Sequence, residues 1–270
     1  MGDILEQYYI YTSMETLNKI IIIGTGNVAS QLAQTLCENH ISIAGIYGRN
    51  QQKATKLAKQ VNAKTILSLD NVKTDVDLAL VCVNDEAIES VIDQLPLTLP
   101  IAYTSGGVQL SQFNNRKSIG VFYPLQTFTK GRSIDLSFVP FLIEAKSKIF
   151  EKQLVTLAKN ISSSVHVADS EQRFQLHLAA VLVNNFSNHL YLLAENHLKK
   201  HDLDFKLLIP LIEETTKKIK TTSPFIAQTG PAKRNDKTVI NNHLNALSGD
   251  TKRLYELFSK SIIKQNNEKL

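Results

Sequence analysis

The chain has little cysteine and no long apolar run, and these shortages exclude several classes of protein. Its 270 residues include two cysteines, Cys37 and Cys82, which are far apart in the sequence and form no CxxC pair. The sequence therefore predicts no disulfide framework and no metal site. Both cysteines stand in apolar stretches, where a buried thiol behaves as a small hydrophobic residue.

Two further shortages concern membranes and nucleic acids. No stretch reaches the roughly 18 apolar residues that a transmembrane helix needs, and no basic-then-apolar signal segment begins the chain. We therefore expect no membrane association and a cytoplasmic location. The net charge of +5 would suit an anionic ligand or a nucleic acid. Because no block of about five like charges appears, we expect a generally basic surface and no nucleic-acid partner.

What the chain does contain is a series of short apolar runs that alternate with amphipathic segments. The run Ile20–Ile23 is wholly apolar and β-branched, which is typical of a strand buried on both faces of a parallel sheet. Further strands are expected at Ile41–Tyr47, Thr65–Leu67, Asp77–Val83, Ile101–Tyr103, Ile119–Phe122, Val139–Ile143 and Val165–Val167. The intervening helices are expected at Asn27–Asn39, at Gln51–Gln60 and after the cap formed by Asn84 and Asp85. This alternation predicts an α/β fold with a Rossmann-type, doubly wound and mainly parallel sheet.

The strand signals stop after Asp169, and the rest of the chain is predicted to be all-α. Helices are expected at Phe174–Lys199, at Leu203–Lys220 with a kink or break at Pro210, and at Leu244–Lys264. A chain of this length suits two domains. We expect a Rossmann domain over 1–168, which includes an N-terminal extension over 1–18, and a helical domain over 169–270.

The turn after the first strand carries a dinucleotide-binding fingerprint. The segment Gly24-Thr25-Gly26-Asn27-Val28-Ala29 matches G-x-G-x-x-[G/A] between a strand and a helix. The first glycine permits the tight turn, the second lets backbone amides approach a pyrophosphate, and the alanine allows close packing of helix and strand. The pyrophosphate would lie at the helix N-terminus, where free amides favour anions. The alternative is a tight βα turn without a ligand.

The end of the second strand distinguishes the two nicotinamide cofactors. NAD-specific sites place a carboxylate there for the ribose 2′-hydroxyl. This chain instead has Gly48-Arg49-Asn50, and Lys53 follows one turn later. An arginine can pair with a 2′-phosphate, so we expect NADP as the cofactor. The alternative interpretation of Arg49 is a solvated loop residue.

Two other strand ends should lie along the same cleft, because ligands of such sheets bind at the carboxyl edge. These ends are Val83-Asn84-Asp85 and Thr104-Ser105-Gly106-Gly107. Asn84 would lie near the nicotinamide ribose, and the second segment offers backbone amides and a hydroxyl. An N-cap at Asn84 and a simple turn at Ser105 are compatible alternatives.

Several stretches, taken with the glycine turn, resemble a known bacterial family. They are Phe122-Tyr123-Pro124-Leu125-Gln126-Thr127-Phe128, Thr229-Gly230-Pro231, and the set Arg234, Asp236 and His243. Members pair a Rossmann-like domain with a helical domain of unassigned function and are described provisionally as NADP oxidoreductases. The wider superfamily includes deazaflavin-dependent NADP reductases, pyrroline-5-carboxylate reductases and 6-phosphogluconate-type dehydrogenases. The resemblance covers the chain from Lys19 onward, and it implies a homodimer through the helical domain and an active site between the domains.

Candidate catalytic residues lie on the long helix and at a strand end. A hydride-transfer enzyme needs a proton donor or acceptor beside its substrate. The helix offers His177 and Asn185, which resemble the Lys and Asn of 6-phosphogluconate-type dehydrogenases, and also Asn184 and Asn188. These residues would alternatively serve helix packing or a polar dimer seam. Tyr123 stands where members of the family commonly carry histidine, so it replaces that residue as a proton donor or simply packs its ring.

The loop Gln228–Asn242 is the candidate for substrate binding. It concentrates charge after a Gly-Pro turn, with Lys233, Arg234 and Asp236. Arg234 could clamp a substrate carboxylate or phosphate. The alternative is a solvated turn between helices.

The leading hypothesis is an NADP(H)-dependent oxidoreductase acting on a small carbonyl, imine or acid substrate. One alternative is a reductase that exchanges hydride between NADP and a deazaflavin, which would not need His177. Another is a non-catalytic NADP-binding sensor, which the tyrosine at position 123 and the missing catalytic lysine leave open.

Overall fold

The computed structural model describes residues 16–72 and 75–268, and the chain divides into two compact units over 1–184 and 185–270. Most of the N-terminal extension predicted over 1–18 lies outside the described residues. The last strand ends at Val167 and a long helical segment begins at Ser170, so the change from α/β to all-α falls where the sequence indicates it. The division into units comes later, within that helical segment.

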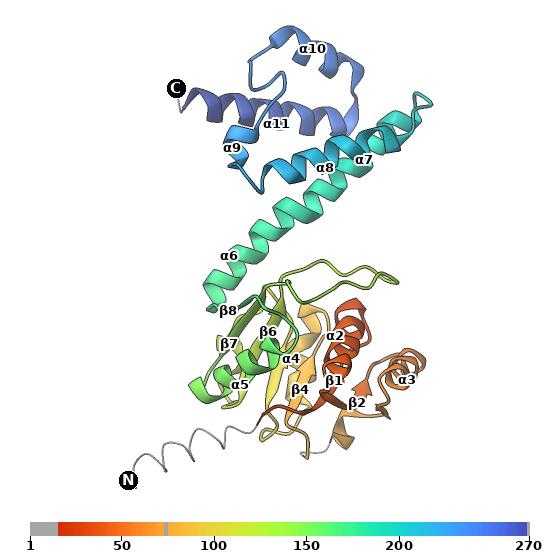
Figure 1. Cartoon of the computed structure of the whole chain (residues 1–270), viewed down its shortest axis with the longest axis vertical. Coiled ribbons are helices and arrows are strands. Elements are labelled where there is room, and N and C mark those ends of the chain that lie inside the picture. The colour runs from red at the N-terminus through yellow and green to blue at the C-terminus, as the bar shows by residue number, and fades with distance from the viewer. Residues whose placement is uncertain (1–15, 73–74, 269–270) are drawn as a thin grey trace. The chain divides into compact units, whose positions relative to one another are not determined.

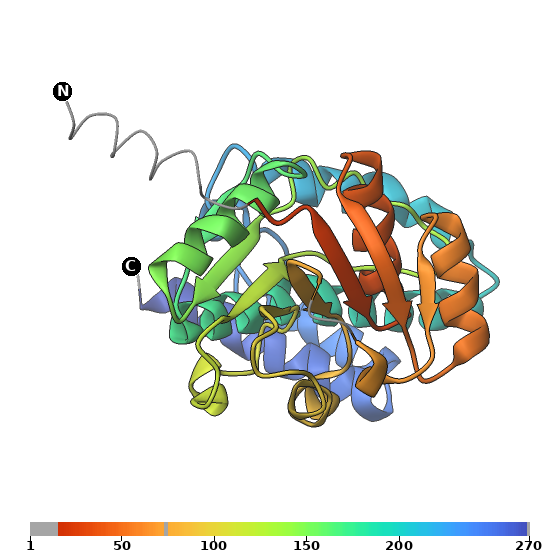
Figure 2. The same cartoon turned by 90° about the horizontal axis from the view of Figure 1, so that it is seen from below.

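The first unit is a Rossmann-like α/β domain built on an eight-stranded sheet (Figures 1 and 2). Its strands are β1 (Lys19–Ile23), β2 (Ser42–Tyr47), β3 (Lys64–Ile66), β4 (Leu78–Val81), β5 (Ile101–Tyr103), β6 (Ile119–Pro124), β7 (Phe141–Ala145) and β8 (Val165–Val167). Its helices are α2 (Asn27–Glu38), α3 (Gln51–Gln60), α4 (Asp85–Asp93), α5 (Lys148–Lys159) and α6 (Ser170–Ala180), with short 3₁₀ turns η1 (Leu69–Asn71) and η2 (Leu110–Phe113). The strand order is β3-β2-β1-β4-β5-β6-β7-β8. The predicted doubly wound, mainly parallel sheet is confirmed.

Both faces of the sheet are buried, as the apolar strands predict. Along β1, Ile20 and Ile22 join one core cluster while Ile21 and Ile23 join the other, because successive side chains point to opposite faces. The first cluster also holds residues of α2, α3 and α5, and the second holds residues of α4, η1 and η2. Figure 2 shows these two helical layers on either side of the strands. The sheet's carboxyl edge is thereby held between two packed layers.

The part of the sheet formed by β6, β7 and β8 departs from simple βαβ winding. Strand β7 pairs antiparallel with β6 and parallel with β8. A long loop without helix joins β6 to β7, and α5 then returns the chain to β8. Neither α5 nor the antiparallel pair follows from the sequence analysis above.

The second unit is helical, as expected, but its boundaries differ from those predicted. The helical segment that begins with α6 continues through a π-helical turn, η3 (Val181–Phe186), into α7 (Ser187–Lys199). The remaining elements are η4 (Phe205–Leu208), α8 (Ile209–Lys218), α9 (Pro224–Ala227), α10 (Lys237–Ala246) and α11 (Gly249–Asn267). Pro210 lies in the first turn of α8, where its missing N–H interrupts no helical hydrogen bond.

Two sequence predictions for this unit are wrong in detail. The helix expected at Leu244–Lys264 is two helices, because the chain turns extended at Leu247 and Ser248. The candidate loop Gln228–Asn242 ends earlier than expected, since α10 begins at Lys237. Asp236 caps that helix by accepting a hydrogen bond from the Val239 amide at 3.1 Å.

Two features are absent from the described residues. None of the described helices has the length and apolar content to cross a membrane. No group of three or more histidine, cysteine or acidic side chains there is arranged to hold a metal ion.

Candidate active site

The glycine turn is built as the fingerprint requires. Gly24 has a φ of +134°, and a Cβ at this position would lie 2.1 Å from the Cys82 carbonyl oxygen. Gly26 is the N-cap of α2, and nothing lies within 4 Å of the position that its Cβ would take. No side chain caps this helix and its first turn holds no acidic residue, so the side chains described there leave its first amides for a ligand. Such a terminus fits a pyrophosphate.

The end of β2 lies directly against this turn. A Cβ on Gly48 would meet the Thr25 side chain at 2.5 Å, so the missing side chain lets the two segments touch. Arg49 follows at the exposed end of the strand, and in the described part of the chain no acceptor engages its guanidinium. Asn50 caps α3 by accepting from the Lys53 amide at 3.0 Å. Arg49 is therefore available to an anionic ligand.

The neighbouring segments complete this edge. The Asn27 side chain donates to the Phe128 carbonyl at 2.9 Å and so ties the glycine turn to the loop after β6. Asn84 is the N-cap of α4 by position, although its side chain makes no capping bond, and Asp85 opens the helix. Ser105 shapes the next turn, since its hydroxyl accepts from the amides of Gly107 and Val108 at 3.0 Å each.

A tyrosine–histidine pair lies at the same edge. The Tyr123 hydroxyl is 2.9 Å from Nδ1 of His177, and the two rings meet edge to face. Gly106 makes the contact possible, because a Cβ there would stand 2.7 Å from the imidazole ring. Residues far apart in sequence thus form one polar pair beside the β5 turn.

The environment keeps the tyrosine protonated. Burial raises the pKa of the Tyr123 hydroxyl above its ordinary value, and the Asp85 carboxylate raises this pKa further, while the Arg173 guanidinium lowers it. At neutral pH the hydroxyl therefore holds its proton and can donate it.

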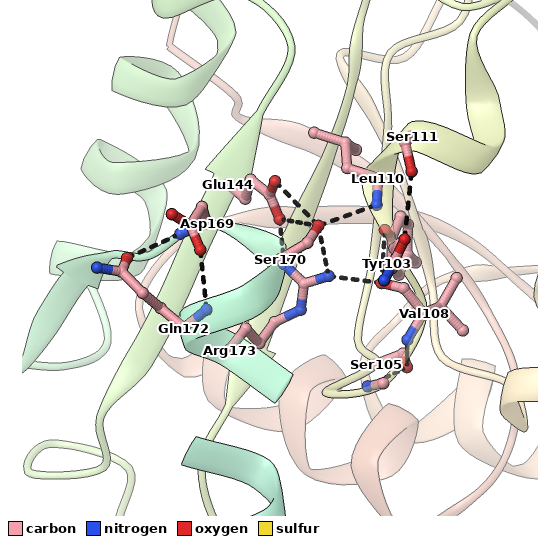
Figure 3. A network of polar contacts seen from close by, with 12 residues as sticks. Tyr103, Ser105, Val108, Leu110, Ser111, Glu144, Asp169, Ser170, Gln172 and Arg173 are labelled. Atoms are coloured by element: carbon pink, nitrogen blue, oxygen red, sulfur yellow. Dashed lines mark hydrogen bonds and ion pairs between the residues drawn. The ribbon is translucent and has the colours of Figure 1, made fainter. Parts of the chain in front are cut away.

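An ion pair that no sequence pattern above indicates anchors the helix that carries His177. Arg173 is 1% exposed and forms an ion pair with Glu144 of β7. Its other terminal nitrogen donates to the Val108 carbonyl and to the Ser170 hydroxyl (Figure 3). Ser170 also donates to Glu144 and accepts from the Leu110 amide at 3.1 Å. The capping box of Asp169 and Gln172 is a sequence pattern that marks this helix end, and α6 begins at Ser170, four residues before the predicted start at Phe174.

Comparison with known proteins places the chain in a family. Residues 19–100 match the model of NADP oxidoreductases described as coenzyme F420-dependent, and residues 139–262 match a domain of unknown function. The structure of a Bacteroides fragilis protein, described provisionally as an NADP oxidoreductase, is 39% identical with a TM-score of 0.85, over 93% of this chain and 100% of that one. The chain belongs to this NADP oxidoreductase family. The suspected family and enzyme class are thereby confirmed.

More distant structures share the fold. A Thermotoga maritima protein is 23% identical with a TM-score of 0.70, over 93% of this chain and 99% of that one. An Aspergillus terreus reductive aminase in complex with NADPH and ethyl levulinate is 15% identical with a TM-score of 0.69, over 93% and 95% of the two chains. Among curated protein sequences no significant match is found.

The remaining candidates of this NADP oxidoreductase belong to the helical segments. Asn184 is the last residue of the first unit and Asn185 opens the second, and both lie in the π-helical turn. Arg234 is exposed, whereas Asp236 is a helix cap. Within the second unit, Thr229 and Pro231 line an apolar cavity of about 540 Å³ together with His243. Nδ1 of this histidine is 2.7 Å from the Tyr255 hydroxyl.

Proposed function

We propose that the protein is an NADP(H)-dependent reductase or dehydrogenase of a small carbonyl, imine or acid substrate, with Tyr123 and His177 as its proton-transfer pair. The observation that carries the proposal is the 2.9 Å contact between the Tyr123 hydroxyl and His177 at the edge that also holds the glycine turn. The substrate would be held near this pair, and Asn185, Arg234 and Asp236 stay candidates for holding it.

The residues at this edge fit the cofactor. The amides at the start of α2 and the open space at Gly26 suit the pyrophosphate, and Arg49 and Lys53 suit the 2′-phosphate. The ends of β4 and β5, from Val83 to Asp85 and from Thr104 to Gly106, are the segments proposed to adjoin the nicotinamide ribose. NADPH, when bound, supplies the hydride that reduces the substrate carbon.

The chain's own residues supply the proton that the reduction requires. Tyr123 holds a proton at its hydroxyl, and this proton can pass to the oxygen or nitrogen of the reduced substrate. His177 is placed to return a proton to the tyrosine, because its Nδ1 lies 2.9 Å from the tyrosine hydroxyl. Tyr123 thus takes the place of the histidine that other family members commonly carry. The fold shared with a reductive aminase favours carbonyl and imine substrates within this class.

Cofactor binding and turnover test the proposal separately. Calorimetry should show that NADPH binds more tightly than NADH and that Arg49→Glu reverses the preference by about 100-fold or more, since a carboxylate repels the 2′-phosphate. NADPH consumption over a panel of small aldehydes, ketones and cyclic imines should fall about 100-fold in Tyr123→Phe while NADPH affinity is unchanged. Equal affinity for the two cofactors would contradict the NADP assignment. Tight NADPH binding with background turnover over the whole panel would leave a sensor as the function.

A deazaflavin partner is the second candidate, because the matched family model is described as coenzyme F420-dependent. Hydride exchange between two cofactors needs no protein proton donor beside a carbonyl. His177→Asn would then leave the exchange rate unchanged, whereas it should lower the turnover of a carbonyl substrate about 100-fold.

The proposal includes a homodimer formed through the helical unit. Helices α7, α8 and α9 contain no buried residue, although all three carry large apolar side chains. Leu207, Leu211 and Ile226 are between 64% and 70% exposed. Apolar surface of this extent is typical of an interface with another chain.

A further inference from the structure

The ion pair between the buried Arg173 and Glu144, whose side chain is 17% exposed, is expected to contribute little net stability. Removing two charges from water costs several kcal/mol per ion, and an apolar pair of similar volume often serves stability equally well. The pair is also incompletely satisfied, because Nε of Arg173 is buried without a hydrogen-bond partner in the described structure. A role other than stability would explain the presence of this ion pair.

The network joins the three segments that carry the tyrosine–histidine pair. Arg173 and His177 are four residues apart on α6 and so lie on the same helical face. His177 lies against Gly106. The loop that follows Gly106 is bound at two points, because Arg173 donates to the Val108 carbonyl and the Leu110 amide donates to the Ser170 hydroxyl (Figure 3).

The third segment is the β6–β7 pair. Glu144 stands directly opposite Val121, and Tyr123 lies two residues further along the same strand. Opposed residues of an antiparallel pair and residues two apart on one strand share a face of the sheet. Glu144 and Tyr123 therefore project from one face, and Arg173 links that face to the helix of His177.

We infer that Arg173 and Glu144 are positioning residues, which hold the register of α6 so that His177 meets Tyr123 over Gly106. This inference rests on the proposed function for its consequence in catalysis, but the geometry itself is a property of the free protein. The planar guanidinium suits the task because its fork engages the carboxylate, the loop carbonyl and the serine hydroxyl at once. Lysine at this position would have the charge without the fork.

The test is the double variant Arg173→Met with Glu144→Leu, which replaces the ion pair by apolar groups of similar volume. Nitrogen NMR of histidine-labelled full-length protein reports the ring tautomer of His177, assigned by the signals that vanish in His177→Gln. Wild type should show one dominant tautomer, because Nδ1 is bonded to the tyrosine, and the double variant should show a mixture. Its thermal midpoint should stay close to that of wild type, since the core remains filled.

The control is Arg116→Met, which removes another buried arginine of the same unit. Arg116 is 3% exposed, donates to the carbonyls of Ile92, Leu95 and Pro96, and likewise has an unpartnered Nε. It should destabilise the fold and leave the His177 tautomer as in wild type. An unchanged tautomer in the double variant would overturn the inference, and so would the same change in both variants.

Turnover gives a second measurement that separates this inference from the proposed function. The double variant and Arg173→Lys should lose about 100-fold in kcat with little change in KM for NADPH, because a displacement near 1 Å is enough to cause such a loss. If wild type has no turnover, the proposed function fails while the tautomer result still decides the inference. A normal kcat in the double variant would overturn the positioning role.

Discussion

The two units differ in where they place their apolar residues. In the sheet unit, β1 and β4 are almost wholly inaccessible and two core clusters cover both faces of the sheet. In the described part of the helical unit only Ala232, Ile240 and Ser259 are buried. The sheet unit therefore has its own core and can hold a site rigidly. The described helical unit leaves most of its apolar side chains partly or fully exposed within one copy, and this difference supports the homodimer proposed above.

The largest effect should come from charging the apolar surface of the helical unit. Leu207 of η4 and Leu211 of α8 are four residues apart in the sequence and are 70% and 64% exposed. If a second copy covers them, the double substitution to aspartate removes about 2 kcal/mol for each leucine and weakens the dimer about 1000-fold. Sedimentation over a concentration series measures the shift.

The sheet unit offers a matched control for that experiment. Leu67 and Leu97 are 73% and 64% exposed, so their substitution by aspartate introduces the same charges at comparable exposure. This variant should sediment as wild type does. The proposed interface on the helical unit would be contradicted if the wild type sedimented as a monomer. It would also be contradicted if the two double variants weakened the dimer equally.

The next largest effect is expected from substitutions in the glycine turn of the sheet unit, where Gly24 and Gly26 have different roles. Gly24→Ala combines a strained positive φ with an overlap against the Cys82 carbonyl, and we expect a loss of about 3 kcal/mol in the free energy of unfolding. Gly26→Ala meets no neighbour, so stability should stay within about 0.5 kcal/mol while NADPH affinity falls at least tenfold. Urea unfolding and calorimetry measure the two quantities. Equal stability losses in the two variants would contradict this division of roles.

The sheet and its cofactor turn could be predicted from the sequence because their signals are local. Wholly apolar strands such as Ile20–Ile23 and a glycine turn between strand and helix depend on neighbouring residues alone. The antiparallel direction of β7 does not, since an apolar run indicates a strand without its direction. Helix α5 was not predicted, although it has a local signal, a cap at Ser147 followed by buried Phe150 and Leu154 at helical spacing.

The candidate site was predictable only in its separate pieces. Tyr123 and His177 were each recognised, but their contact joins residues 54 positions apart and depends on the missing side chain of Gly106. Arg173 was missed because a charged residue in the first turns of a helix is expected to be exposed. Its burial follows from Glu144, which is 29 residues away and belongs to a strand. Long-range pairing of this kind leaves no periodic trace in the sequence.

The dry interior of the sheet unit should make it sensitive to alkali. Burial raises the pKa of the Cys82 thiol from 9.0 to about 12, although its hydrogen bond with Thr104 lowers this pKa slightly. The folded chain then retains a proton that the unfolded chain loses, so stability falls as the pH rises above 9. At pH about 10.5 this group alone should cost about 2 kcal/mol.

Comparison of two cysteine variants isolates this contribution. Between pH about 8 and about 10.5, Cys82→Ala should lose about 2 kcal/mol less of its unfolding free energy than wild type does. Cys37→Ala, which removes the half-buried thiol of α2, should keep the wild-type loss. Urea titrations at both pH values give the four differences. Identical losses in both variants would show that the thiol of the sheet unit is not held in a dry interior.

The smallest effect concerns Asp236, where a cap and a substrate ligand make different predictions. As the N-cap of α10 its carboxylate accepts the Val239 amide, and Asp236→Ala should cost about 1 kcal/mol in unfolding free energy. Asparagine caps helices as well as aspartate does, so Asp236→Asn should restore stability. If the carboxylate also binds substrate, Asp236→Asn will raise the KM for the substrate while the thermal midpoint stays at the wild-type value. If the residue only caps, both quantities will be normal in Asp236→Asn, and the role of Asp236 in the helical unit will be structural.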